Sequence, residues 1–346
     1  MAYTQISAGF GYTVLLRSDG SAVAIGQNEY GQCSIPALDE GMAYIQVAAG
    51  VLHTVLLRSD GSAVAIGQNN YGQFNIPALE DEMAYAQISA GFDYTMLLRS
   101  DGSAVAIGRN EYGQCSIPAL DEGMWYTQIA AGLHHTVLLR SDGSAVAIGQ
   151  NGDGQCNIPA LEDGMAYTQI SAGFGYTVLL RSDGSAVAIG QNEYGQCSIP
   201  ALDEGMWYTQ IAAGLHHTVL LRSDGSAVAI GQNGDGQCNI PSPEPGMCYI
   251  SDMRVGRDLT AQLELAGEDD AVTLIGSSLA GEERFRLTAH GDDSAWETYK
   301  RIARELKMNL WNLHLVLPDG QLLAKVCRTN PASSVADVAT QFPSHN

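Results

Sequence analysis

The sequence predicts an all-β propeller of six full repeats, with six or seven blades, followed by a small α+β domain. Methionine recurs every 41 residues from Met1 to Met247, and the surrounding sequence repeats with it, so residues 1–246 are six copies of one unit. A period of ~40 residues with strand-like content is typical of a propeller blade or a solenoid turn. Helical periodicity is absent from the copies. After Ser251 the composition changes, and lysine and helix-forming stretches begin.

Each copy contains three clear strand patterns and a short fourth one. In the first copy these are Tyr3–Ala8, Tyr12–Arg17, Ser21–Ile25 and Cys33–Ile35. The pair Asp19-Gly20 separates the second and third apolar runs, which is a strong signal for a β-hairpin. We therefore expect an up-and-down meander of short antiparallel strands in every copy.

The loops at one end of this meander vary between copies, whereas those at the other end do not. Gly9–Gly11 and Asn28–Gln32 lie at one end, called here the top face, and the hairpin Arg-Ser-Asp-Gly-Ser at the other end is identical in all copies. Variable loops rich in aromatic residues and histidine are typical of protein contacts. The predicted contact residues are Glu29, Tyr30, Tyr71, Asp93, Tyr112, Trp125, His134, Asp153, Tyr194, Trp207, His216 and Asp235.

Trp125 and Trp207 replace an alanine at the second position of copies four and six. The sequence leaves open whether they are exposed anchors for a partner or packing residues at the rim.

No group of residues predicts catalysis, a cofactor or a metal site. Five of the seven cysteines share one repeat position, where copy two has Phe74, so that position is expected to hold a packed, free thiol. The pairs His134-His135 and His216-His217 would each direct only one ring to a given site, because adjacent strand residues point to opposite faces. We expect the histidine before threonine to be structural, and Asp19 and its equivalents to form turns. The protein is therefore expected not to be an enzyme.

The charge excludes several classes of partner. The chain has 38 acidic and 17 basic residues, a net charge of −21. The six copies hold seven arginines, no lysine and 24 acidic residues, a net −17. This balance argues against nucleic acid and against an anionic membrane surface. No apolar run reaches the ~20 residues of a membrane span, and no basic and apolar leader opens the chain. We expect a monomer in the cytoplasm, with the nucleus as the alternative.

The repeat resembles a known family. The pattern AGxxHT, followed by Asp-Gly and a final Gly-Gln, resembles the regulator of chromosome condensation repeat, and Gly132–Thr136 and Asn151–Gln155 fit it closely. The resemblance implies a β-propeller, usually of seven blades. The compact unit is more similar to the short-blade bacterial members, including the propeller-type β-lactamase inhibitor, than to the long-blade eukaryotic founder of the family. Residues 247–251 only begin a seventh copy, which leaves open a six-bladed ring, a seventh blade partly built from 247–265, or an array cut from a longer one.

The last hundred residues predict a second domain. We assign 1–252 to the propeller, 253–270 to a linker or closing segment, and 271–346 to a β-grasp domain. The expected strands are Ala271–Leu279, Arg284–His290 and Leu313–Leu317, with an amphipathic helix from Ser294 to Leu306 before the third.

This order of elements resembles the ubiquitin-like β-grasp. The resemblance implies a hydrophobic recognition patch that includes Val316. Because the chain ends without Gly-Gly, we expect a built-in docking domain and not a conjugated modifier.

These features together predict a non-catalytic adaptor. Its propeller loops would bind a protein partner whose identity the sequence leaves open, and its second domain would connect it to a ubiquitin pathway. Two alternatives follow from the resemblance: a guanine-nucleotide exchange factor for a small GTPase, and a propeller-type enzyme inhibitor.

Overall fold

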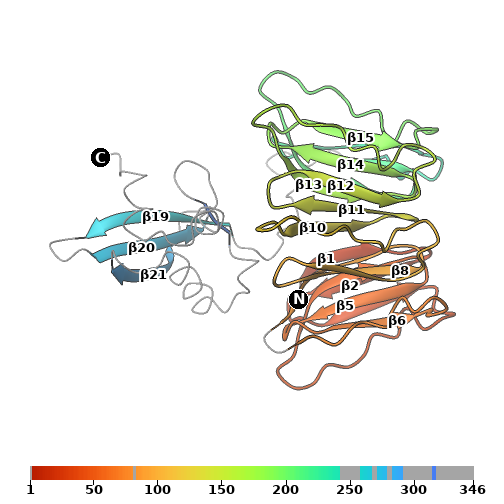
Figure 1. Cartoon of the computed structure of the whole chain (residues 1–346), viewed down its shortest axis with the longest axis horizontal. Coiled ribbons are helices and arrows are strands. Elements are labelled where there is room, and N and C mark those ends of the chain that lie inside the picture. The colour runs from red at the N-terminus through yellow and green to blue at the C-terminus, as the bar shows by residue number, and fades with distance from the viewer. Residues whose placement is uncertain are drawn as a thin grey trace. The chain divides into compact units, whose positions relative to one another are not determined.

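The computed structural model describes residues 2–80 and 83–241, together with the backbone of four strands between residues 258 and 316 (Figure 1). The chain divides into two compact units, Met1–Asp252 and Met253–Asn346.

The first unit is a series of six antiparallel three-stranded blades. In every blade the strands follow one another in sheet order, as the repeated meander predicts. Their bounds are β1 (Tyr3–Ala8), β2 (Tyr12–Arg17) and β3 (Ala22–Gly26); β4 (Tyr44–Ala49), β5 (His53–Arg58) and β6 (Ala63–Gly67); β7 (Tyr85–Ala90), β8 (Tyr94–Arg99) and β9 (Ala104–Gly108); β10 (Tyr126–Ala131), β11 (His135–Arg140) and β12 (Ala145–Gly149); β13 (Tyr167–Ala172), β14 (Tyr176–Arg181) and β15 (Ala186–Gly190); β16 (Tyr208–Ala213), β17 (His217–Arg222) and β18 (Ala227–Gly231).

The expected fourth strand at Cys33–Ile35 does not form. Its backbone amides are used inside the loop: Cys33 N–H donates to Asn28 Oδ1 at 2.8 Å, and Ser34 N–H donates to the carbonyl of Gly31 at 3.0 Å. Since these donors are satisfied locally, they cannot build a strand ladder. The segment after β3 is therefore a compact loop in each blade.

The invariant hairpin depends on both of its central residues. The Asp19 carboxylate accepts hydrogen bonds from the backbone N–H of Ser21 at 2.9 Å and from its hydroxyl at 2.7 Å. Gly20 has a φ of +81°, and a Cβ added there would lie 2.4 Å from Cβ of Ala43 in the next blade. A side chain at this position would thus meet both backbone strain and a clash. These contacts confirm the interpretation of the repeated aspartates as turn formers.

The hydrophobic core lies between successive blades. Tyr12, Val14 and Leu16 of blade 1 form one buried cluster with residues of blade 2, including Tyr44 and Leu56. Similar clusters recur at the four following borders. Cys33 packs against the first cluster as a free, partly buried thiol, as its exchange with phenylalanine predicts.

Polar side chains also join each blade to the next. Gln128 of blade 4 is buried, and its Oε1 accepts the backbone N–H of Ile170 in blade 5 at 2.9 Å. The equivalent glutamines make the same bond at the other borders, from Gln5 to Val47, Gln46 to Ile88, Gln87 to Ile129 and Gln169 to Ile211.

Replacing Gln128 by alanine is expected to lower the free energy of unfolding by about 1–3 kcal/mol, because it leaves the N–H of Ile170 buried and unpaired. Urea denaturation of the purified chain would measure the change. Gln27→Ala is the control: that side chain is exposed, so its loss should cost within about 0.5 kcal/mol. Equal losses in the two variants would contradict the bridging role.

The residue before the repeated threonine forms a second bridge between blades. It is tyrosine in odd blades and histidine in even blades. In odd blades the tyrosine hydroxyl reaches forward: Tyr94 OH donates to the carbonyl of His135 at 2.5 Å and lies 3.2 Å from Thr136 Oγ1. In even blades the imidazole does so, since His53 Nε2 lies 2.9 Å from Thr95 Oγ1. The histidine before threonine is therefore structural, as expected.

The first blade exposes its leading face, which is the face that packs against the preceding blade in blades 2 to 6. Tyr3 is 59% exposed and Ile6 is 68% exposed, whereas Tyr44 and Val47 at the same positions of blade 2 are 2% exposed. A preceding blade covers this face at every later border. The described residues thus contain six blades. The strand at 258–266 belongs to a sheet of the second unit, and residues 247–257 lie outside the described part of the chain.

The second unit contains a four-stranded sheet in the order β21-β20-β19-β22. Strands β20 (Ala271–Ser278), β21 (Glu283–His290) and β22 (His314–Val316) lie where the sequence predicts strands. β19 (Asp258–Ala266) pairs antiparallel with β20 and parallel with β22. Val316 pairs with Thr260, and the predicted helix 294–306 lies outside the described residues.

The position of β19 corrects the assignment of 253–270 as a linker or closing segment. The sequence carries a signal for this strand, because apolar residues alternate with polar ones from Leu259 to Leu265, with a period of two. The ubiquitin-like identity of this unit remains a prediction.

Candidate protein-binding face

The two variable loops of each blade meet across the blade border at the top face. His134, in the first loop of blade 4, contacts two rings of blade 3: Phe92 of the first loop at 5.4 Å and Tyr112 of the second loop at 5.1 Å between centroids. His216 of blade 6 repeats this with Phe174 at 5.0 Å and Tyr194 at 5.2 Å. At these two borders the face is thus built from the loops of both neighbouring blades.

Exposed apolar side chains concentrate on this face. Among the described residues, seven of the twelve exposed large hydrophobic side chains belong to these loops. Carboxylates alternate with them. The seven are Phe10, Tyr30, Tyr71, Tyr112, Phe174, Tyr194 and Leu215, and the exposed acidic residues beside them are Glu29, Glu111, Asp153, Glu193 and Asp235.

The second loop holds its exposed side chain on a fixed backbone. The buried Gln114 accepts the N–H of Tyr112 through Oε1 at 3.0 Å, and its own carbonyl accepts Thr136 Oγ1 of blade 4 at 2.8 Å. Asn110 Oδ1 accepts the N–H of Cys115 at 2.8 Å. Because the loop is anchored in this way, binding through Tyr112 would require little ordering of the chain.

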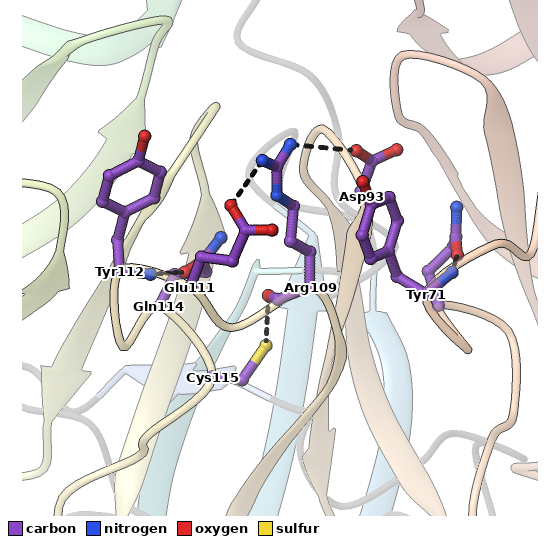
Figure 2. Close-up of polar contacts among 8 residues, drawn as sticks. Tyr71, Asp93, Arg109, Glu111, Tyr112, Gln114 and Cys115 are labelled. Carbon is purple, nitrogen blue, oxygen red and sulfur yellow. Dashed lines mark hydrogen bonds and ion pairs between the residues drawn. The ribbon is translucent and has the colours of Figure 1, made fainter.

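One arginine departs from the repeat and forms an ionic cluster at the border of blades 2 and 3 (Figure 2). Arg109 replaces the glutamine that the other five copies have. Its Nη1 lies 3.6 Å from Asp93 Oδ2, its Nη2 lies 2.5 Å from Glu111 Oε2, and its guanidinium carbon lies 5.2 Å from the Tyr71 ring centroid. Burial raises the pKa of Asp93, and the Arg109 charge opposes that shift. The bond with Glu111 raises the pKa of Arg109.

Ten of the twelve predicted contact residues lie on the top face, but they are not equivalent. Nine are exposed or partly exposed, whereas Asp93 is 4% exposed and acts on this surface through Arg109. Sequence reasoning missed Arg109, although the break in a repeated glutamine column signals it. It also missed Phe10 and Phe174, whose first-loop column is apolar in every copy.

Trp125 and Trp207 do not belong to the top face. Both precede the first strand of their blade, and this point lies at the hairpin end of the preceding blade. A Cβ added at Gly102 would lie 2.4 Å from Cβ of Trp125, and one at Gly184 would lie equally close to Trp207. This placement corrects the prediction that the two tryptophans belong to the contact residues of the top face. Trp125 is partly buried, and Trp207 is 51% exposed.

The histidine pairs divide into a buried and a surface member. Burial lowers the pKa of His135 to about 4 and also lowers the pKa of the partly buried His134. Within the part of the chain that the structure describes, no three His, Cys, Asp or Glu residues are placed to hold a metal ion. No helix in that part is long and apolar enough to cross a membrane.

Six consecutive three-stranded blades with interlocking borders define a repeat protein of the β-propeller class. The chain belongs to the regulator of chromosome condensation (RCC1) repeat family, whose model matches once in each blade. The matched residues are 3–32, 44–73, 85–114, 126–155, 167–196 and 208–237.

Solved structures support the same fold. Prp20p from Saccharomyces cerevisiae is 20% identical, with a TM-score of 0.57 over 66% of this chain and 72% of that chain. Human WBSCR16 is 19% identical, with a TM-score of 0.60 over 72% and 81%. The CRINKLY ectodomain of the Arabidopsis thaliana receptor kinase ACR4 is 17% identical, with a TM-score of 0.54 over 81% and 97%. A search of curated protein sequences gave no match.

Proposed function

We propose that this protein is a non-catalytic interaction scaffold that binds a protein partner through its top face. The observation that carries the proposal is the row of exposed aromatic side chains on anchored loops. Aromatic residues on a preformed surface are the usual anchors of protein interfaces. The yeast relative Prp20p is described by its binding to Gsp1p and histones, so a propeller of this fold serves protein binding there.

The second unit supports a narrower form of this proposal. An adaptor in a ubiquitin pathway would use the second unit, which adds β19 to residues 271–346, as a ubiquitin-like docking domain, with Val316 in its recognition patch. We propose that it acts as a monomer in the cytoplasm or nucleus.

Guanine-nucleotide exchange is the second candidate, favoured by the likeness to Prp20p with its Gsp1p binding. If this second candidate is right, the purified chain will accelerate nucleotide release from a Ran-like GTPase. The third candidate, inhibition of an enzyme, requires inhibition of a class A β-lactamase.

The scaffold function predicts that the top face is needed to retain a partner. We expect simultaneous Tyr30→Ser, Tyr71→Ser, Tyr112→Ser and Tyr194→Ser substitutions to reduce recovery of specific partners at least ~10-fold, because each removes an exposed anchor. Quantitative affinity capture with the intact chain would measure this. Trp207→Ala is the control, since it removes an exposed aromatic side chain at the opposite end of the blade. Equal recovery with the top-face variant and the control would overturn the proposal.

A further inference from the structure

The border of blades 2 and 3 shows how this surface holds a guanidinium group. Arg109 lies between the carboxylates of Asp93 and Glu111, with the ring of Tyr71 at one side (Figure 2). Charge-assisted hydrogen bonds and a cation–π contact thus act on one planar group.

The border of blades 4 and 5 presents the same kind of acceptors without a cation. Gln191 occupies the position of Arg109, Glu193 that of Glu111, and Gly175 that of Asp93. A carboxylate is nevertheless present, because Asp153 reaches across from blade 4. A Cβ added at Gly175 would lie 3.6 Å from Asp153 Oδ2 and 3.3 Å from Gln191 Oε1. We call the site formed by Asp153, Gln191 and Glu193 the acceptor notch.

The acceptor notch has an unused acceptor and no neutralising charge. Gln191 Oε1 is buried and has no hydrogen-bond partner among the described residues, as is also true of Gln68 Oε1 in blade 2, but of these two only Gln191 has a glutamate two residues further on. Both ion pairs found in the described part of the chain involve Arg109. The other arginines of the array end the middle strand of each blade, beside the hairpin and away from the top face. Buried acceptors are rarely left unpaired, and beside the carboxylate of Asp153 this one can accept a donor from outside the chain.

We infer that the acceptor notch binds an arginine side chain of the protein partner, in the way that the blade 2–3 border holds Arg109. The inference rests on the proposed function and names the chemistry of its partner. A guanidinium offers five N–H donors in a fixed planar fork, enough to pair with two carboxylates and an amide oxygen. The net charge of −17 on the six repeats would attract a basic segment of the partner.

The test uses the full chain and a synthetic probe, acetyl-Gly-Arg-Gly-Arg-Gly-amide. Binding is measured by isothermal titration at low salt. A second peptide replaces arginine by citrulline, which keeps the shape and removes the charge. We expect the citrulline peptide to bind at least ~10-fold more weakly, a difference of about 1.4 kcal/mol.

Two variants locate the probe. Gln191→Arg should weaken binding of the arginine peptide at least ~10-fold, because the chain's own guanidinium would fill the notch. Gln232→Arg is the matched control: it adds the same charge at the equivalent position of blade 6, where Gly234 replaces the glutamate. Asp153→Asn with Glu193→Gln removes the carboxylates without adding bulk and should weaken binding similarly.

Equal binding of the arginine and citrulline peptides, or equal effects of Gln191→Arg and Gln232→Arg in folded protein, would overturn the inference. The partner assay separates this failure from failure of the scaffold function. If the four-tyrosine variant loses the partner while Gln191→Arg retains it, the scaffold function holds and the arginine notch does not. If both variants retain the partner, the scaffold function itself is wrong.

Discussion

Replacing Tyr126 by alanine is expected to lower the free energy of unfolding by about 3–5 kcal/mol, whereas the same change at Tyr3 should cost less than about 1 kcal/mol. The two tyrosines occupy the same repeat position, but Tyr126 is 1% exposed and Tyr3 is 59% exposed. Tyr126 shares a buried cluster with Tyr94, Met96 and Leu138, and its hydroxyl donates to the carbonyl of Pro118 at 2.9 Å. Its removal therefore leaves both a cavity and an unpaired carbonyl.

Urea denaturation of the two variants and the parent protein would measure the difference. Since both substitutions remove the same atoms from nearly identical repeats, effects on the unfolded chain largely cancel. Similar losses at Tyr3 and Tyr126 would show that the leading face of blade 1 is covered in solution, and would contradict its exposure.

The strands of a blade could be predicted from the repeated sequence, whereas the chemistry of the top face depends on differences between the copies. Three strands per copy and the Asp-Gly hairpin follow from turn chemistry and apolar runs within about 20 residues. The loop after β3 was harder to predict, because its amides bond to Asn28 and to the loop backbone, and β-propensity does not report such local bonds.

Contacts between blades could not be predicted from a single repeat. The sequence shows that tyrosine and histidine alternate before threonine, but only the structure shows that both reach the next blade. In the same way, nothing in one copy places Asp153 beside Gln191, because the two residues belong to different blades. For Trp207 the information was already in one copy. Its aromatic side chain suggested a contact residue of the top face, but its place before the first strand of the blade puts it at the hairpin end.

The buried histidines make stability depend on pH in a defined direction. Burial lowers the pKa of His53 and of His135 to about 4, from an ordinary value of 6.5. Between these values the unfolded chain binds a proton at each histidine and the folded chain does not. The free energy of unfolding should therefore fall as the pH is lowered from about 6.5 to about 4. Each histidine would contribute about 3 kcal/mol over this window.

Urea denaturation at several pH values between 7 and 4 would measure this slope. His53→Tyr with His135→Tyr should flatten it, because tyrosine occupies the same position in blades 1, 3 and 5 and does not titrate in this range. The hairpin residues Asp19, Asp183 and Asp224 contribute below this window. Hydrogen bonds from the following serine lower their pKa below the ordinary 3.8, so their contribution is lost only at lower pH. An unchanged slope in the double variant would show that the two histidines become protonated within the folded protein.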